Sequence, residues 1–367
     1  MRPLDLVINP EPGNANEAGG ILNPAATRGP DGNLYLFPRL VAKGNYSRIG
    51  IARVVFDSKG EPCGIERLGI ALEPEMPYEL RPDGGGCEDP RVTFVEPLKK
   101  YVMTYTAFSP NGPRIALAIS KDLLTWERLG LATFEPYEGI HFEGVDNKDA
   151  AMFPLAVRNP FDHYELAILH RPLFPGTLPE DTMLMDADRD IDLHRESIWI
   201  SYSSAGPQDA PYQLRQFTSH HRLAAPVSDW ESLKIGSGAP PVMTKHGWLF
   251  IYHGVTDLAP PDSDVHHLSY SAGVMILSKD HPQELLYRST HPALAPSAYV
   301  GPRGTPSNVV FPTGIDRRDD IGEPDRIDVY YGINDYQIAV ARLDIPDTLP
   351  HAGQADPPES PTDKTVI

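Results

Sequence analysis

The sequence has few cysteines, no long apolar run and no excess of basic residues. Cys63 and Cys87 form no CxxC pair, and two thiols in 367 residues are typical of free cysteines in a reducing compartment. The 13 histidines include no HExxH motif and no Cys/His cluster with zinc spacing, so we expect no metal site. No stretch reaches the roughly 18 apolar residues of a membrane span, and the N-terminus lacks the layout of a signal peptide. These absences predict a cytoplasmic protein with no membrane partner.

The charge balance is strongly acidic. Lysine and arginine number 32 against 50 aspartates and glutamates, which gives a net charge of −18 at pH 7. A surface this negative does not attract the phosphate backbone of a nucleic acid, so we expect no nucleic-acid partner. Any anion that the protein binds must therefore meet a local basic cluster. With 41% hydrophobic and 22% charged residues, the composition is that of a globular protein with a sizeable core.

Proline is abundant and spread along the chain, at 39 of 367 residues. Because proline breaks helix interiors and cannot donate to a central sheet ladder, this frequency favours short strands joined by structured loops. Only the polar stretch 344–367 gathers prolines in the manner of a poorly ordered C-terminal tail.

Five pairs of apolar segments rich in aromatic and β-branched residues recur along the chain, and both their composition and their alternation predict strands. The first members are 34–40, 100–107, 164–172, 248–255 and 328–335, and the second members are 48–54, 114–120, 197–203, 270–277 and 337–343. A paired-strand unit that repeats five times favours radial repetition of small sheets.

A short motif of small residues and prolines precedes each pair and suits an innermost strand crowded near an axis. These entry motifs are 23–25, 88–91, 148–151, 238–241 and 312–314. The sequence therefore predicts an all-β fold, a five-bladed β-propeller over residues 1–343 with a central active-site funnel. A β-sandwich or a pair of β domains would explain the strands but not the common order of entry motif, strand and strand.

Charged residues fall on the entry motifs and on the strands that follow, where inner-strand side chains converge on one pocket. They are Asp89, Arg91, Lys148 and Asp149, followed by Arg39, Arg171, His253 and Asp335. Each one taken alone could be a surface charge or part of an ion pair between blades. In an acidic protein, however, Arg39, Arg114, Lys148, Arg171 and His253 aimed inward would form a positive site suited to phosphate.

Six motifs, taken in order, resemble those of glycoside hydrolase family 130, which consists of β-mannoside phosphorylases and some β-mannosidases on a five-bladed propeller. The motifs are 86–91 (GCEDPR), 105–107 (YTA), 147–154 (NKDAAMFP), 169–172 (LHRP), 251–255 (IYHGV) and 310–314 (VFPTG). The resemblance runs from about Asn23 to Leu343, with Asp335 placed by the preceding YYG sequence.

The resemblance implies a role for each matching residue. Asp89 matches the catalytic acid, which is thought to pass its proton to the glycosidic oxygen through the 3-hydroxyl of the mannosyl unit while inorganic phosphate attacks from the opposite face. The product would be α-mannose 1-phosphate with inverted configuration, and phosphate would be a co-substrate in the absence of any cofactor. The phosphate positions are Arg114, Lys148, Arg171, Tyr252 and His253, and the sugar positions are Asn23, Arg39, Arg91, Asp149 and Asp335.

Plain structural roles stay open for several of these residues, because Arg114 could be a solvated strand end, Lys148 could pair with Asp149, and Tyr252 with His253 could be packing. A hydrolase of the same family would need a carboxylate base, for which Glu143 is the acidic candidate. A non-catalytic glycan-binding propeller and a propeller glycosidase with several inner carboxylates are the alternatives from other classes. The glycosidic linkage, the acceptor sugar and possible association into a homo-oligomer are left open.

Overall fold

The computed structural model describes residues 1–137, 139–174, 195–260, 263, 265–296 and 308–350. Strands dominate these residues, and the helices among them are short 3-10 turns, at η1 Ala15–Glu17, η2 Glu96–Leu98, η3 Pro211–Arg215, η4 Asp229–Glu231 and η5 Asp319–Ile321. None of the helices in the described parts of the chain has the length and apolar character needed to cross a membrane.

The first sheet contains two antiparallel four-stranded halves. Its strands are β2 Gly20–Arg28, β3 Leu34–Ala42, β4 Tyr46–Phe56, β5 Pro62–Leu72, β6 Gly85–Val95, β7 Lys100–Ser109, β8 Gly112–Ser120 and β9 Glu127–Leu131. Among the described strands, the ladder that joins the halves β2–β5 and β6–β9 is the parallel pairing of Tyr46 and Ser47 with Gly85 and Gly86. Each half is thus a small meander, joined to its neighbour by a short contact.

Two further sheets follow in chain order. One contains β10 Thr133–Phe134, β11 Asp146–Met152, β12 Val157–Arg158, β13 Tyr164–Leu173, β14 Ile198–Ser203 and β15 Gln216–Ala224. The other contains β16 Lys234–Ser237, β17 Val242–Thr244, β18 Gly247–Asp257, β19 Leu268–Leu277 and β20 Leu285–Arg288.

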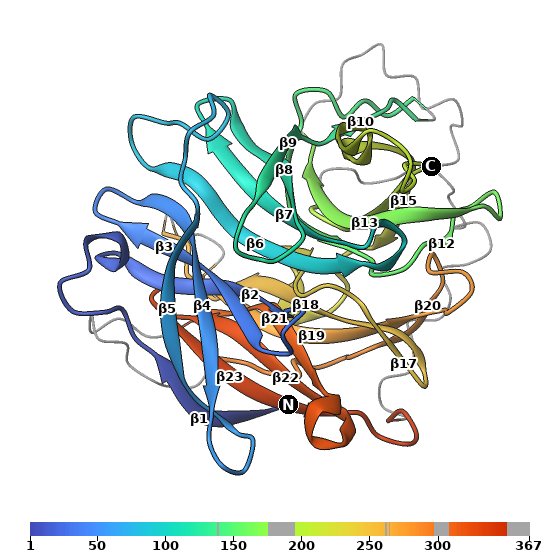
Figure 1. Ribbon diagram of the computed structural model, residues 1–367. Helices are drawn as coiled ribbons and strands as arrows, with labels where there is room; N and C mark the ends of the chain where they lie inside the picture. Colours follow the sequence, from blue (N-terminus) through green and yellow to red (C-terminus); the bar gives the residue numbers. More distant parts are fainter. Residues whose placement is uncertain (138, 175–194, 261–262, 264, 297–307, 351–367) are drawn as a thin grey trace.

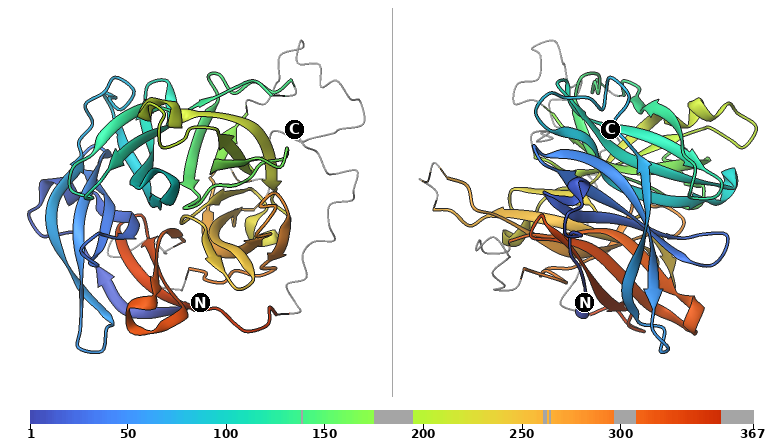
Figure 2. Two further views of the ribbon diagram at one scale, coloured as in Figure 1. Left: turned by 45° about the vertical axis from the view of Figure 1, so that its right-hand side comes forward. Right: turned by 60° about the vertical axis from the view of Figure 1, so that its left-hand side comes forward.

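The last sheet joins the first and the last strand of the described residues. Its strands are β21 Val310–Arg318, β22 Glu323–Ile333, β23 Gln337–Asp344 and the N-terminal β1 Arg2–Ile8. Strand β1 pairs antiparallel with β23, so the first strand of the sequence completes the final sheet (Figure 1). In the left view of Figure 2 the sheets follow one another in chain order around a common centre.

All five predicted strand pairs are confirmed as antiparallel neighbours, namely β3/β4, β7/β8, β13/β14, β18/β19 and β22/β23. Four of the five entry motifs lie on the strand before the pair, on β2, β6, β11 and β21. The fifth, 238–241, lies in the break between β16 and β17. Pro240 and Pro241 have no N–H to donate to the neighbouring strand, which explains the interruption there.

The core consists of apolar layers between successive sheets rather than one central cluster. Leu34 and Leu36 of β3 pack with Tyr330 of β22 and Val340 of β23. In another layer, side chains of β13 and β14 pack with those of β18 and β19.

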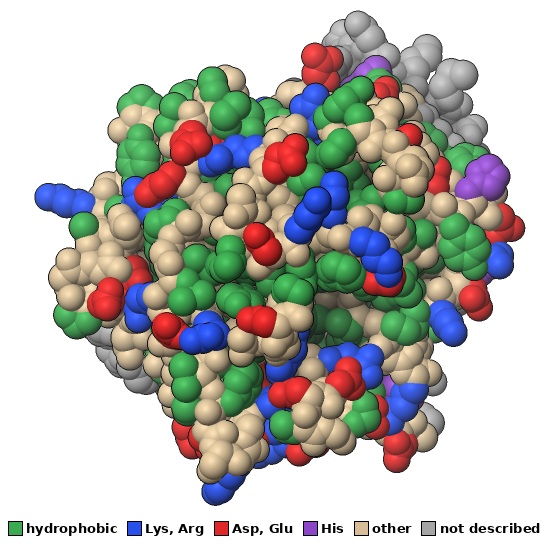
Figure 3. Space-filling view, in the orientation of Figure 1, with side chains coloured by type: hydrophobic (Ala, Val, Ile, Leu, Met, Phe, Trp, Pro, Cys, Tyr) green, Lys and Arg blue, Asp and Glu red, His purple; other side chains and the backbone are tan. Residues whose placement is uncertain are grey.

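On the face seen in Figure 3, acidic and basic side chains are interspersed.

The described part of the predicted C-terminal tail is tied to the last sheet, while residues 351–367 lie outside the described residues. Ile345 is buried, and its N–H donates to the Asp325 carbonyl at 2.8 Å. Residues 175–194, 261–262 and 264, which belong to two long connections between predicted strands, also lie outside the described residues.

A buried ion network links the last sheet to the first. Asp328 of β22 accepts hydrogen bonds from Arg318 Nη1 at 2.6 Å and Arg326 Nε at 2.8 Å. Arg318 also donates to the Gly60 carbonyl at 2.6 Å, and Arg326 donates to both carboxylate oxygens of Glu61. Since Gly60 and Glu61 lie in the β4–β5 hairpin, this network holds the chain's first and last sheets together.

Replacing Asp328 by Asn should destabilise the fold, because two buried guanidinium groups lose a charged partner. We expect the free energy of unfolding to fall by about 3 kcal/mol, as measured by urea denaturation. The matched control is Asp344→Asn, which removes an exposed carboxylate paired with Arg342 and should cost less than about 1 kcal/mol. Equal losses in the two variants would contradict the role given to the buried network.

Candidate active site

The inner strands carry β-bulges at equivalent places, and these bulges deliver polar side chains. The register shifts between Leu22 and Ala25 on β2, between Glu88 and Arg91 on β6, and between Lys148 and Ala151 on β11. At the bulges Asn23, Asp89 and Asp149 have φ angles of 44°, 45° and 57°. Asn and Asp tolerate this left-handed conformation better than other non-glycine residues, and bulges re-aim side chains beside functional sites.

Asp89 lies at the meeting point of three inner segments. Its Oδ1 accepts hydrogen bonds from Asn23 Nδ2 at 2.8 Å and from Arg39 Nη1 at 3.3 Å. Burial alone would raise the pKa of this carboxyl, but the charges of Arg39 and Arg91 and the bond from Asn23 outweigh it and lower the pKa below its ordinary value. Asp89 is therefore ionised when the site holds no ligand.

Glu88 shares the same guanidinium group. Arg39 Nη2 donates to Glu88 Oε1 at 2.8 Å, while Arg39 Nε donates to Ser47 Oγ at 2.9 Å. Burial raises the pKa of Glu88, whereas the pKa of the adjacent Asp89 is lowered, so the two neighbouring carboxyls have pKa values shifted in opposite directions. Environments that separate two acids in this way are typical of acid–base sites.

Asp149 is the most tightly held carboxylate of the site. Its Oδ2 accepts from Arg171 Nε at 2.7 Å, its Oδ1 lies 3.4 Å from Arg91 Nη2, and its side chain is 1% exposed. Burial would raise its pKa, but the charge of Arg171 and the other cations around it hold the pKa far below the ordinary value. This carboxylate is therefore charged at neutral pH and fixes the cations that surround it.

Arg91 lies beneath the site rather than on its surface. Its guanidinium donates to the carbonyls of Gly238, Ser237 and Asp89 at 3.0, 2.8 and 2.9 Å, and its side chain is 1% exposed. The structure buries Arg91 and Asp149 against each other, and a contact of either residue with the sugar stays a prediction. They position the residues above them.

The predicted cations Lys148 and Arg171 lie together, because β11 and β13 pair them directly. Burial, and next the charge of Arg171, lower the pKa of Lys148. Lys234 of β16 joins them, and burial with the charges of Arg171 and Lys148 lowers its pKa to about 8. Like charges held together away from water favour the binding of an anion between them.

His253 is buried beside this cluster. Its Nε2 lies 3.6 Å from Asp149 Oδ2, and neither ring nitrogen makes a hydrogen bond with the described residues. Burial lowers the pKa of His253 to about 3, so the ring is neutral at pH 7 and can offer one N–H donor.

Arg114 lies at the rim, at the start of β8. Its guanidinium pairs with Asp146 and donates to the Gly144 carbonyl at 2.8 Å. Asp146 stands two residues before Lys148 on β11, so Arg114 is anchored next to the cationic cluster and its side chain is 23% exposed.

Tyr252 is a correction to the predicted set. Successive strand residues point to opposite faces, so Tyr252 points away from His253. Its hydroxyl donates to Glu231 Oε2 at 2.8 Å inside the sheet packing, and the side chain is fully buried. The tyrosine that lies at the site is Tyr270 of β19, whose ring centroid is 6.1 Å from that of His253. Burial raises the pKa of Tyr270, which also senses the charges of Arg171, Asp335 and Asp149.

Asp335 and Arg39 line a cavity of about 750 Å³ beside Asp89. Asp335 is placed there by the tight turn after β22, in which Asn334 and Asp335 have φ angles of 63° and 48°. The rest of the lining comes from the start of β2 and the β3–β4 hairpin. A space of this size is in the range of small-molecule sites.

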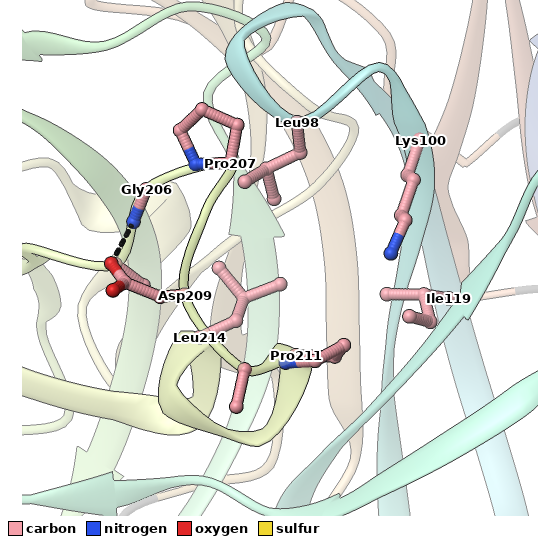
Figure 4. Close-up of a pocket in the computed structure, with 10 residues that line it drawn as sticks. Leu98, Lys100, Ile119, Gly206, Pro207, Asp209, Pro211 and Leu214 are labelled. Atoms are coloured by element: carbon pink, nitrogen blue, oxygen red, sulfur yellow. Dashed lines mark hydrogen bonds between the residues drawn. The ribbon is translucent and has the colours of Figure 1, made fainter.

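A different cavity, of about 40 Å³, lies between Lys100 and Ile119 on one side and the segment around η3 on the other (Figure 4). It is close to the size that a few waters fill, and its lining includes none of the predicted site residues. Among the described residues no group of His, Cys, Asp and Glu has the arrangement of a metal site.

Comparison with known proteins identifies the family. A sequence model of glycoside hydrolase family 130, described as beta-1,4-mannooligosaccharide phosphorylase, matches residues 2–350. The chain belongs to glycoside hydrolase family 130. The predicted family is therefore confirmed, and with it an enzyme of a family of mannoside phosphorylases.

Individual family 130 proteins are similar over most of their length. The 1,2-beta-oligomannan phosphorylase of Thermoanaerobacter sp. (strain X514) is 30% identical over 347 residues, 93% of this chain and 95% of the relative. The beta-1,4-mannooligosaccharide phosphorylase of Ruminococcus albus is 26% identical over 261 residues, which are 71% of this chain and 63% of the relative. The solved beta-1,2-mannobiose phosphorylase of Listeria innocua superposes with a TM-score of 0.65 at 22% identity, covering 92% of this chain and 94% of that one, and shows the shared fold.

Sequence reasoning missed Lys234, Tyr270 and Glu196, a carboxylate that pairs with Arg171. Lys234 opens the short strand that leads to the fourth entry motif, so the entry region begins earlier than the prolines suggested. Tyr270 pairs with Val255, two residues from His253, which places the two rings on one face of the sheet. The sequence contains this signal, because side chains alternate between the two faces along the strands that carry IYHGV and Tyr270.

Replacing Gly236 by Ala should disturb the buried cluster directly. Gly236 pairs with His253, and a Cβ there would lie 2.4 Å from Asp149 Oδ2 and 2.5 Å from His253 Cε1. We expect the free energy of unfolding to fall by about 1–3 kcal/mol in urea denaturation, because the overpacked cluster must shift. Gly64→Ala on β5, where a Cβ meets nothing within 4 Å, is the control and should leave stability unchanged. A stable Gly236→Ala variant would mean that the cluster is loosely packed.

Proposed function

We propose that this protein catalyses the inverting phosphorolysis of a β-mannoside, giving α-mannose 1-phosphate and a shortened acceptor sugar. The observation that carries the proposal is a desolvated cluster of Lys148, Arg171 and Lys234 close to the carboxyl group of Asp89, inside a protein of net charge −18. A cationic pocket suits an anionic nucleophile, and a single acid is then sufficient. Membership of the family, and the phosphorylase names of its relatives, support the same reaction.

In this mechanism a phosphate oxygen forms a bond to the anomeric carbon while the bond to the glycosidic oxygen breaks. Asp89 supplies the proton that the leaving oxygen needs, through the 3-hydroxyl of the mannosyl unit. The lowered pKa of Asp89 in the empty site must rise before the reaction. An arriving phosphate dianion and the exclusion of water by the sugar both favour the protonated carboxyl, so substrate binding itself prepares the acid.

The proposed phosphate ligands are Lys148, Arg171 and His253, with Arg114 at the rim, and Lys234 and Tyr270 join them. The proposed sugar contacts are Asn23, Arg39 and Asp335, which line or border the large cavity. Arg91 and Asp149 lie beneath the phosphate ligands and the sugar contacts and hold them in position. Inorganic phosphate is the co-substrate and we propose no cofactor.

We also propose that the fold is a five-bladed propeller. The two halves of the eight-stranded sheet would be the first two blades, the next two sheets the third and fourth, and β21–β23 with β1 the fifth. The pairing of β1 with β23 would then close the ring. Two unpaired cysteines agree with a cytoplasmic enzyme.

Replacing Asp89 by Asn tests the reaction and the acid together. We expect turnover of β-mannobiose by the wild type to require inorganic phosphate, and the variant to lose about 10²–10⁴-fold in kcat because the amide cannot donate the proton. Retained binding of the disaccharide, measured by calorimetry, would separate this loss from misfolding. Equal turnover of the wild type in phosphate-free buffer would contradict phosphorolysis, and full activity of the variant would contradict the acid.

Lys234→Arg tests the cationic cluster through its pH dependence. Because the pKa of Lys234 is about 8, the lysine loses its charge as the pH rises through that value, and kcat/KM for phosphate should fall. Arginine stays charged, so the variant should keep more of its kcat/KM between about pH 8 and pH 9.5. Lys245→Arg, an exposed lysine paired with Asp325 and Asp347, is the control and should leave the profile unchanged. The same alkaline decline in Lys234→Arg would remove Lys234 from the phosphate site.

A further inference from the structure

The phosphate site proposed above contains a carboxylate of its own, that of Glu196. This residue stands just before β14, and its carbonyl accepts a hydrogen bond from the Ile235 N–H at 3.1 Å. That bond fixes the Glu196 backbone beside Lys234 on β16. The position is therefore set by the sheet framework.

The Glu196 side chain contacts two of the cations. Its Oε2 forms an ion pair with Arg171 Nη1, and its Oε1 lies 4.0 Å from Lys234 Nζ. The opposite edge of the Arg171 guanidinium binds Asp149 through Nε at 2.7 Å. Arg171 is thus held between two carboxylates.

These two carboxylates differ in how firmly they are held. Asp149 is 1% exposed and surrounded by Arg171, Arg91 and His253. Among the described residues, Glu196 pairs closely with Arg171 and more distantly with Lys234, at 4.0 Å, and its side chain is 25% exposed. Water can solvate Glu196 if it leaves, whereas Asp149 has no exposed route, so only Glu196 can be exchanged for another anion.

We propose that Glu196 is an internal anion that occupies the Arg171 and Lys234 edge of the empty site, and that inorganic phosphate must displace it to bind. Glu196 is then a specificity-determining residue, because only an anion that binds these cations more strongly than one carboxylate gains entry. The inference rests on the proposed function, since it concerns the same site.

The charges favour displacement over joint occupation. Glu196 and Asp149 together already place two negative charges beside Arg171, and a phosphate dianion would add two more at the same edge. The retained carboxylate would repel phosphate, whereas a carboxylate released into water would leave Arg171, Lys148 and Lys234 to the phosphate oxygens. Because part of the binding free energy is spent on releasing Glu196, the observed affinity for phosphate is reduced.

The test compares Glu196→Gln with the wild type in two separate assays. Calorimetric titration with inorganic phosphate, without sugar, measures binding, and the KM for phosphate at saturating β-mannobiose measures the same competition during turnover. We expect both the Kd and the KM to fall about fivefold or more, with kcat within about twofold of the wild type. Glu127→Gln, an exposed carboxylate on the outer strand β9, is the control and should change neither constant.

Glu196→Ala provides a second variant in case the glutamine keeps a bond to Arg171, and it should shift both constants in the same direction. A Kd and KM that are unchanged or higher in both variants overturn the proposal, because Glu196 would then be neutral or would help to bind phosphate. Failure of the proposed function looks different, since the wild type would turn over β-mannobiose without phosphate whatever the variants bind.

Discussion

The buried carboxylate of Asp149 is the interaction on which the site depends. Two arginines and a histidine from three other strands converge on it, and its burial leaves it no alternative partner. A buried charge of this kind contributes little net stability, because desolvation offsets most of the attraction. Its contribution is positional. It fixes Arg171 and Arg91, and through them the cations on one side of the site and the β6 bulge that carries Asp89 on the other.

The sheet framework makes this convergence possible by local irregularity. Asn23, Asp89 and Asp149 each lie at a bulge with a left-handed backbone, a conformation that costs free energy in an ordinary strand. The small residues and prolines of the entry motifs allow the inner strands to approach one another closely. Gly238, for example, leaves room for Pro312 of another entry motif, because a Cβ there would lie 2.4 Å from the Pro312 carbonyl oxygen. The residues that bring the chain into position thus differ from those proposed to do chemistry.

Much of the fold could be read from the sequence, because the entry motifs and strand pairs repeat in the same order. The assignment of strands in one repeat therefore supports the assignment in the others. The proximity of Asn23, Arg39 and Asp89 also follows from that order. The exchange of Tyr252 for Tyr270 could have been read from strand alternation once His253 was placed in the site, because adjacent strand residues point to opposite faces of the sheet. The burial of Arg91 against Asp149 depends on packing between distant strands, and so does the placement of Glu196 beside Lys234. These are tertiary contacts that no local pattern encodes.

An acidic protein that binds an anion must concentrate its positive charge where the ligand arrives, and here Lys148, Arg171 and Lys234 do so in a chain of net charge −18. In the proposed reaction, phosphate bound there is the nucleophile that attacks the mannosyl carbon with inversion. The most direct measurement is ³¹P and ¹H NMR of the wild-type reaction with β-mannobiose and inorganic phosphate. We expect the phosphate signal to be replaced by that of α-mannose 1-phosphate in step with loss of the disaccharide. Release of free mannose without a phosphorylated product, or formation of the β-anomer, would contradict it.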